Sequence, residues 1–141
     1  MNNKGFTLVE VLAVIALLGI IMAIVFPVLN STLFDTKTSI NKLAVKNIKE
    51  SAEMLAQDIY VCNGTSPVLD ILKNELNYSE VKNCKDARAK LESGIDVPIE
   101  VLINNNYITK ASNCEGYILM YMSGNKMSNI NVDASNITCK S

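Results

Sequence analysis

Residues 6–29 read FTLVEVLAVIALLGIIMAIVFPVL, and this stretch decides how the rest of the chain is interpreted. It carries a single charged side chain, Glu10, and no charged residue lies between Val11 and Leu29. A helix needs about 20 apolar residues to cross the hydrocarbon core of a bilayer, and this stretch is long enough. The sequence therefore predicts a membrane-spanning helix at the start of the chain.

A short leader, Met1 to Gly5, precedes the apolar stretch, and Lys4 is its only charged side chain. An ordinary secretory signal is cut after its apolar segment, which the mature protein then loses. The plausible junction here is Gly5-Phe6, which lies before the apolar segment. Cleavage at this bond would leave the helix on the mature protein, with a new amine at Phe6.

Glu10 is the candidate functional residue of the helix. An ionisable side chain in a membrane span costs about 2.5–3.5 kcal/mol at the centre and less near an end, so it is a functional hypothesis by default. The apolar stretch contains no Lys or Arg to pair with Glu10. The amine freed at Phe6 would lie about one turn away, on the same chain or on a packed neighbour. The alternative is that Glu10 lies at headgroup depth and snorkels to water.

The sequence Gly5-Phe6-Thr7-Leu8-Val9-Glu10, with its junction before the apolar segment, resembles the leader of type IV pilins and the related pseudopilins. The resemblance is specific over about the first 30 residues. It implies that a prepilin peptidase recognises Lys4, Gly5 and Phe6, that it cuts after Gly5, and that Phe6 becomes N-methylphenylalanine. It also implies that Glu10 neutralises the N-terminal amine of the adjoining subunit during filament assembly.

The same resemblance implies partners and a location. The partners are further copies of the chain in a homopolymer, other pilins, and an inner-membrane assembly platform driven by a cytosolic ATPase. The chain would begin as a single-pass protein of the cytoplasmic membrane with its N-terminus in the cytoplasm, and would end in an extracellular filament. The implied function is that of a structural subunit of a type IV pilus in adhesion, twitching motility or surface interaction. The alternative is a pseudopilin of a type II secretion or DNA-uptake (competence) machine.

Gly19 and Pro27 are the two helix-breaking residues of the span. Glycine costs a helix up to about 1 kcal/mol relative to alanine, and proline lacks the N–H that a helix interior needs. Similar pilins have both residues at these points. One interpretation is a segment that stretches or melts when subunits pack into a fibre, and the other is an ordinary kink, which membrane helices tolerate.

Beyond the span, apolar residues recur at three- and four-residue intervals, which is the pattern of an amphipathic helix. The apolar stripe consists of Ile40, Leu43, Ala44, Ile48, Ala52, Leu55 and Ile59. Polar residues between 30 and 38 weaken the pattern and allow a break there. A helix that continues from Phe6 to about Tyr60 would be about 80 Å long at 1.5 Å per residue.

The remaining chain predicts a small globular domain. Ser66-Pro67 reads as the start of a short helix over 68–76, and Asp96-Val97-Pro98 as the start of a second one that ends at Ile103. Strands are expected at 117–122, 130–133 and 137–139. The fold class is α+β, a long helix packed against a small antiparallel sheet. The expected parts are a cleaved leader (1–5), a membrane-spanning assembly helix (6–29), its amphipathic continuation (30–61) and a disulfide-bonded domain (62–141).

Four cysteines lie in this last part, at positions 62, 84, 114 and 139. An even number in a small exported domain favours disulfides over metal ligation. We favour Cys62–Cys84 and Cys114–Cys139 among the three possible pairings. Each would close a loop worth about 3–3.5 kcal/mol on the chain-entropy model. The alternative is free thiols in a reducing habitat.

The composition argues against several function classes. The chain has no histidine, so it cannot build a Ser-His-Asp or Cys-His catalytic arrangement or a Cys/His metal centre. We expect no enzyme activity, no cofactor and no metal. The formal net charge of −1 provides no basic field for nucleic acid. After residue 111 the only acidic side chains are Glu115 and Asp133, whereas major pseudopilins bind calcium there through several oxygens, and this favours the pilin.

Overall fold

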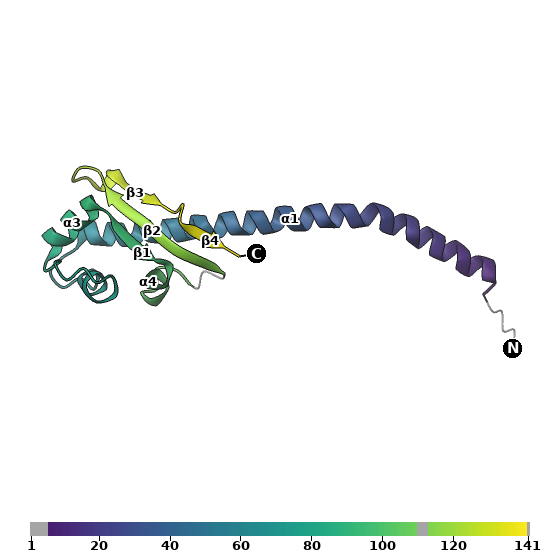
Figure 1. The fold of residues 1–141 in the computed structure, drawn as a ribbon, viewed down its shortest axis with the longest axis horizontal. Helices are drawn as coiled ribbons and strands as arrows, with labels where there is room; N and C mark the ends of the chain where they lie inside the picture. Colours follow the sequence, from purple (N-terminus) through teal and green to yellow (C-terminus); the bar gives the residue numbers. More distant parts are fainter. Residues whose placement is uncertain (1–5, 110–112, 141) are drawn as a thin grey trace. The chain divides into compact units, whose positions relative to one another are not determined.

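The computed structural model describes residues 6–109 and 113–140. It divides into two compact units, Met1–Ser39 and Ile40–Ser141. One helix, α1 (Leu8–Val61), has 54 residues and contributes to both units (Figure 1). The predicted long helix is therefore present, from two residues after Phe6 to one residue after Tyr60.

The polar segment after residue 29 stays helical, although the sequence allowed a break there. Its hydroxyl groups donate hydrogen bonds back to carbonyls of the preceding turn. Ser31 Oγ and Thr32 Oγ1 both donate to the Val28 carbonyl, at 3.0 and 2.9 Å, and Thr36 Oγ1 donates to the Thr32 carbonyl at 2.7 Å. These side chains thus satisfy their polar groups within the helix instead of competing with it.

In the second unit, α1 packs with one face into the core. Ile48, Leu55 and Ile59 are fully buried, as the amphipathic pattern predicts. Ser51 is the one buried polar residue of this face, and its hydroxyl donates to the Asn47 carbonyl at 2.8 Å. The predicted stripe is therefore buried from Ile48 to Ile59, whereas Ile40 and Leu43, which the sequence pattern also assigned to it, are exposed by 59% and 58%.

A four-stranded antiparallel sheet covers this face of α1 (Figure 1). Its strands are β1 (Ile95–Pro98), β2 (Cys114–Met122), β3 (Ile130–Asp133) and β4 (Ile137–Cys139). The central strand, β2, pairs with β1, β3 and β4. The side chains of Ile118, Met120 and Met122 point into the core, while Tyr117 and Tyr121 lie on the open face. The α+β class and the antiparallel sheet are as expected.

Strands β3 and β4 follow each other along β2 but are separated by a bulge (Figure 1). Leu119 is opposite Asp133 and Gly116 is opposite Ile137, so three steps along β2 correspond to four along its partner. One extra residue in one strand is the definition of a β-bulge. At this place the Asn136 carbonyl approaches the Cα of Gly116, whose φ is +128°, and a Cβ there would collide with it.

The short helices differ in part from the expectation. The first comprises α2 (Val68–Asp70) and a π-helical turn, η1 (Ile71–Glu75), and no side chain caps its start, so the Ser66 hydroxyl is not an N-cap. The second, α4 (Ile99–Asn104), begins after Pro98. The expected helix start at 96–98 is wrong, because these residues belong to β1. A third helix, α3 (Cys84–Ser93), was not predicted, and a 3₁₀ turn (Met127–Asn129) precedes β3.

Two disulfides close the second unit, Cys62–Cys84 and Cys114–Cys139. These are the pairs that the sequence analysis favoured. The first joins the residue after α1 to the start of α3. The second links two residues that are directly opposite in the β2–β4 pairing, with their Cα atoms 4.0 Å apart. Both ends of the domain, the end of its long helix and its last strand, are thereby covalently fixed.

Candidate assembly site at the start of α1

Helix α1 begins with a reciprocal pair of hydrogen bonds between Thr7 and Glu10. The Thr7 N–H and the Thr7 hydroxyl donate to Glu10 Oε2, at 3.0 and 3.1 Å. The Glu10 N–H lies 3.3 Å from Thr7 Oγ1 and 3.0 Å from the Thr7 carbonyl. This is a capping box, in which the residue before the helix and the third helical residue satisfy each other's N–H groups. Thr-x-x-Glu before an apolar run is the sequence signal of such a box, although the box was not among the predictions.

The capping box leaves part of Glu10 available. Both donors from Thr7 reach Oε2, and Oε1 has no hydrogen-bond partner among the described residues. The carboxylate lies one turn from Phe6, whose side chain is 84% exposed. Of the three predicted processing residues, Lys4 and Gly5 lie outside the described residues. A cationic group brought to this end of α1 would therefore meet a carboxylate whose orientation is already fixed.

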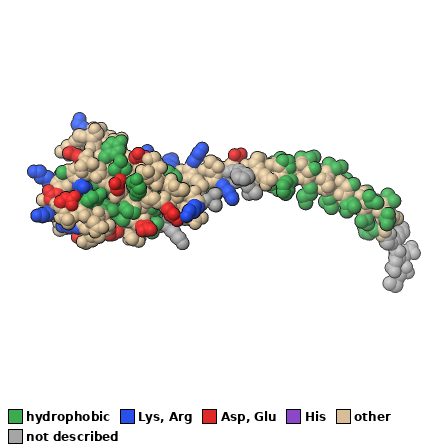
Figure 2. All heavy atoms as spheres, in the orientation of Figure 1, with side chains coloured by type: hydrophobic (Ala, Val, Ile, Leu, Met, Phe, Trp, Pro, Cys, Tyr) green, Lys and Arg blue, Asp and Glu red, His purple; other side chains and the backbone are tan. Residues whose placement is uncertain are grey.

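Most side chains at the start of this helix are apolar and exposed, and Figure 2 shows them along the visible face. Seventeen large apolar side chains of residues 6–29 are exposed, by 40% (Val25) to 84% (Phe6). They are Phe6, Leu8, Val9, Val11, Leu12, Val14, Ile15, Leu17, Leu18, Ile20, Ile21, Met22, Ile24, Val25, Phe26, Val28 and Leu29. By length and composition α1 can cross a membrane. A helix that is apolar all round belongs in lipid or between other helices.

Gly19 and Pro27 both lie inside this uninterrupted helix. A Cβ built on Gly19 would meet nothing within 4 Å, so packing within the chain does not explain the glycine. Pro27 removes one donor from the ladder and crowds the Ala23 carbonyl. Two residues that weaken a helix thus lie in a part of α1 whose large apolar side chains are exposed among the described residues.

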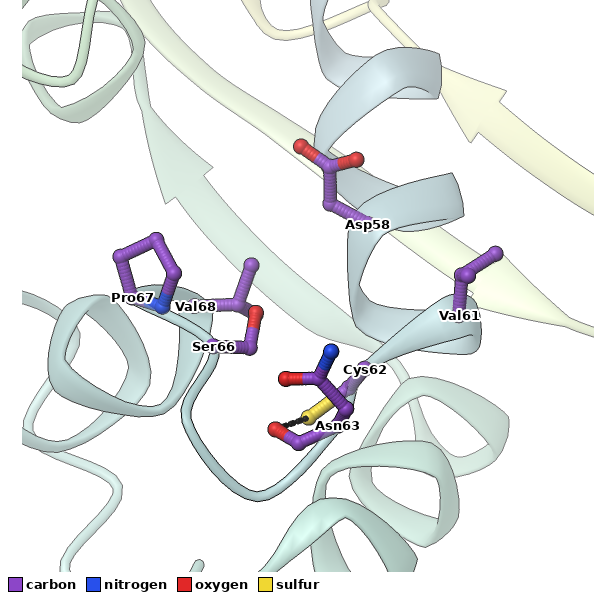
Figure 3. A pocket seen from close by; sticks show the side chains of 7 residues that line it. All are labelled: Asp58, Val61, Cys62, Asn63, Ser66, Pro67 and Val68. Atoms are coloured by element: carbon purple, nitrogen blue, oxygen red, sulfur yellow. Dashed lines mark hydrogen bonds between the residues drawn. The ribbon is translucent and has the colours of Figure 1, made fainter.

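A pocket lies beside the C-terminal end of α1 (Figure 3). A pocket of about 270 Å³ is lined by Asp58, Val61, Cys62, Asn63, Ser66, Pro67 and Val68. Asp58 accepts a hydrogen bond of 2.6 Å from the Tyr107 hydroxyl. Burial, and then the neighbouring Asp58 carboxylate, raise the pKa of Tyr107 well above its usual value. The pocket was not anticipated from the sequence, because its two sides come from a helix end and the loop after it.

The described residues contain no group of three or more His, Cys, Asp or Glu side chains that could hold a metal ion. The two acids near the end of the chain lie in separate interactions. Glu115 forms an ion pair of 3.2 Å with Lys140. Asp133 accepts a hydrogen bond of 2.9 Å from the Ser135 N–H, which lowers its pKa, with a smaller contribution from Lys49.

The fold and this N-terminal end together fit a membrane-anchored α+β protein. Comparison with protein families identifies the prokaryotic N-terminal methylation motif at residues 1–26. This motif is the leader signature of type IV pilins and pseudopilins, which confirms the resemblance seen in Gly5-Phe6-Thr7-Leu8-Val9-Glu10. It implies processing by a prepilin peptidase and polymerisation with other pilins. No curated protein and no solved structure matches the chain.

Proposed function

We propose that this chain is a structural subunit of a type IV pilus, cut after Gly5, N-methylated at Phe6 and polymerised through residues 6–29. The observation that carries the proposal is the apolar helix with a single carboxylate, Glu10, held at its start. Before assembly the chain is a single-pass protein of the cytoplasmic membrane with its N-terminus in the cytoplasm. Afterwards it is part of an extracellular filament for adhesion or motility.

The exposed apolar side chains of residues 6–29 must be shielded from water both before and after assembly. Burial of one Val, Leu, Ile, Phe or Met side chain contributes about 1.5–3 kcal/mol. With seventeen such side chains exposed, the helix cannot be stable in water. Lipid provides the cover in the membrane. Once the subunit leaves the membrane, only a bundle of equivalent helices from other copies can replace it, and such a bundle is the core of a fibre.

Glu10 gives this bundle its register. Cleavage after Gly5 creates an amine at Phe6, and that amine must be neutralised when it enters an apolar core, because an unpaired buried charge is costly. Among the described residues Glu10 Oε1 accepts no hydrogen bond, while Thr7 holds Oε2, so Oε1 would accept the amine. Each incoming subunit would pair its amine with the Glu10 of a subunit already in place. An assembly platform and its cytosolic ATPase would provide the extraction step.

The alternative is a pseudopilin of a type II secretion or DNA-uptake machine, which has the same N-terminal end. Two features favour the pilus. The domain is closed by two disulfides. The acids of its C-terminal part, Glu115 and Asp133, are held by Lys140 and by the Ser135 N–H instead of converging on one cation site.

The decisive experiment replaces Glu10 by valine in cells that have no other copy. The Glu10→Val chain loses the only charge of its span, so we expect a normal amount in the membrane and few or no filaments by electron microscopy. Glu92→Val, which removes an exposed acid from α3, is the matched control and should assemble normally. Abundant filaments from Glu10→Val would return Glu10 to a snorkelling role.

Two further measurements test the other parts of the proposal. Mass spectrometry of the mature chain should find N-methylphenylalanine at position 6 as the first residue, and an intact Met1 would contradict the processing. Deletion of the gene should remove long surface filaments. Loss of protein secretion or DNA uptake with the long filaments intact would instead support the pseudopilin.

A further inference from the structure

The loop that leaves α1 contains the one asparagine in the chain that is followed by glycine, Asn63-Gly64. All three residues of Asn63-Gly64-Thr65 are exposed. The residue directly before Asn63 is Cys62, which the disulfide to Cys84 fixes in place. An asparagine in such a turn can be attacked by the backbone nitrogen of the residue that follows it, and glycine is the least obstructive successor because it has no Cβ.

The geometry of the turn activates the side-chain amide of Asn63. The Thr65 N–H donates to Asn63 Oδ1 at 3.3 Å, and the Thr65 hydroxyl donates to the same oxygen at 3.1 Å. Because a backbone N–H can only donate, it must face the oxygen and not the NH₂ group of the amide. Two donors on a carbonyl oxygen stabilise the negative charge that develops there when a nucleophile adds to the carbon. They also hold the side chain folded over the backbone of the turn.

We propose that Asn63 is a self-modifying site at which the turn promotes deamidation. The Gly64 backbone nitrogen gives up its proton and forms a bond to the Asn63 Cγ, while Thr65 stabilises Oδ1. The bond from Cγ to Nδ2 breaks, and Nδ2 leaves as ammonia, which gives a five-membered imide. One water molecule then opens the imide at either C–N bond and leaves aspartate or isoaspartate. The net reaction consumes one water and releases one ammonia, with no oxidant or cofactor.

The space around Gly64 is open, so the fold does not prevent the Gly64 nitrogen from approaching the Asn63 Cγ. Outside the two neighbouring residues, a Cβ built at Gly64 would meet no atom within 4 Å, and the φ of Gly64 is not in the left-handed region. Gly64→Ala is therefore compatible with the fold but places a methyl group beside the attacking nitrogen. This substitution separates the reactivity of the turn from its structural role.

The product changes the pocket at the end of α1 (Figure 3). Asn63 and Asp58 both line this hollow of about 270 Å³. Deamidation turns a pocket with one carboxylate into a pocket with two and adds one negative charge to each subunit. Because ammonia is lost to solvent, the change accumulates with the age of the protein. It would mark old copies chemically, whether or not the chain forms a pilus.

The test uses the full-length chain in detergent, incubated at pH 8.5 and analysed by peptide mass spectrometry. We expect a gain of about 1 Da at Asn63, a mixture of aspartate and isoaspartate, and one ammonia released per modified chain. Asn136-Ile137-Thr138 is an internal control, because it has threonine at the same spacing but a β-branched residue after the asparagine. Asn136 should remain unmodified over the same time.

Three variants examine the mechanism. Gly64→Ala should slow the reaction at Asn63 at least about tenfold, because the methyl group obstructs the attack. Thr65→Val should slow it about three- to tenfold, the usual effect of one lost hydrogen bond, while Thr65→Ser should react like the original chain. Unfolding in urea with reductant should also slow the reaction, because the turn no longer holds the amide.

Four outcomes would overturn the proposal. These are an unmodified Asn63, equal rates at Asn63 and Asn136, a rate that neither Thr65→Val nor unfolding changes, and a glycan on Asn63 in protein from the native host.

Discussion

The hydrogen bonds between Thr7 and Glu10 have two effects at the start of α1: they cap the helix, and they orient the Glu10 carboxylate. In a bilayer, the free N–H groups at the start of a helix have no water to bind, and each unsatisfied group costs several kcal/mol. The capping box satisfies the Thr7 N–H inside the chain. It also fixes the carboxylate of Glu10 before any neighbour arrives. The amine-binding role proposed for Glu10 thus depends on Thr7 as a positioning residue.

A threonine-to-valine change at position 7 separates these contributions, since valine keeps the shape but loses the hydroxyl. Loss of an N-cap hydroxyl costs about 1 kcal/mol, and Glu10 Oε2 loses one of its two donors. We expect Thr7→Val to reach the membrane normally but to give severalfold fewer filaments, and Thr7→Ser to assemble like the original chain. Immunoblots of membranes and filament counts by microscopy provide both readouts. Equal filament counts for the valine and serine variants would show that the hydroxyl is dispensable.

Gly116 has a different kind of constraint, the close approach of the Asn136 carbonyl at the bulge. Gly116→Ala combines a collision with an unfavourable φ of +128°, so we expect a loss of about 2–4 kcal/mol in the free energy of unfolding. Gly124→Ala is the matched control, because its φ is also positive (+67°) but its Cβ would meet nothing. It should lose only about 1 kcal/mol. Urea unfolding followed by tyrosine circular dichroism measures the second unit, which contains all five tyrosines. Equal losses in the two variants would mean that the bulge relaxes.

Among the elements, the long helix could be predicted from sequence because its pattern repeats over many turns. The strand β1 could not. Ile95-Asp96-Val97-Pro98 alternates buried and exposed side chains, but four residues are too few to establish a period, and Pro98 suggested a helix start. The strand exists because residues 117–120 pair with it. Such a pairing between distant segments leaves no local signal.

Helix α3 and the capping box of α1 were also not predicted. Unlike β1, both have a local signal in the sequence. Asn83 Oδ1 accepts hydrogen bonds from the Lys85 and Asp86 N–H groups, at 2.9 and 3.0 Å, and Asp86 accepts one from the Lys82 N–H. An asparagine followed three residues later by an acid is a recognised helix start. The pocket beside Asp58, by contrast, depends on the path of the loop after α1 and was out of reach of any local pattern.

Arg88 joins α3 to the end of α1. Its Nε donates to the Tyr60 carbonyl at 2.8 Å and its Nη2 to the Cys62 carbonyl at 3.3 Å, while the guanidinium lies 5.8 Å from the centre of the Tyr60 ring. A cation here satisfies carbonyls that the helix end leaves free. We expect Arg88→Lys to lose about 1–2 kcal/mol in the free energy of unfolding, since lysine cannot donate in a fork. Lys85→Ala, in the exposed first turn of the same helix, should change it by less than about 0.5 kcal/mol. The contrast is measured by thermal unfolding, and an Arg88→Lys variant as stable as the original would show that charge alone suffices.

For the molecule as a whole, the charges predict a broad pH plateau of stability. The chain has no histidine and its cysteines are in disulfides, so few side chains titrate between about pH 5 and 9. Hydrogen bonds from the Ser135 N–H to Asp133, and from the Glu80 N–H and Lys90 to Glu80, lower the pKa of both carboxyls. The stability that they add is present at neutral pH and is lost as the pH falls below about 4.

The alkaline limit depends on Tyr107, whose raised pKa means that the folded chain holds the phenolic proton more tightly than the unfolded chain. Its contribution is complete below about pH 10 and is lost as the pH rises further. Thermal midpoints measured from pH 3 to 11 should therefore be flat in the middle and fall at both ends. Tyr107→Phe should lower the midpoint on the plateau and make the alkaline fall shallower. A steep change near pH 6 or 7 would contradict the assignment.

The two disulfides also determine how far the molecule can be stretched. They bridge sequence separations of 22 and 25 residues. When a force pulls on the two ends of the second unit, these 47 residues cannot contribute to the extension, even after all strands have separated. At about 3.5 Å per extended residue, the bridges withhold about 160 Å of contour length. Single-molecule stretching should recover this length only after a reductant is added. Under tension, an oxidised subunit would therefore extend less than a reduced one, by about 160 Å.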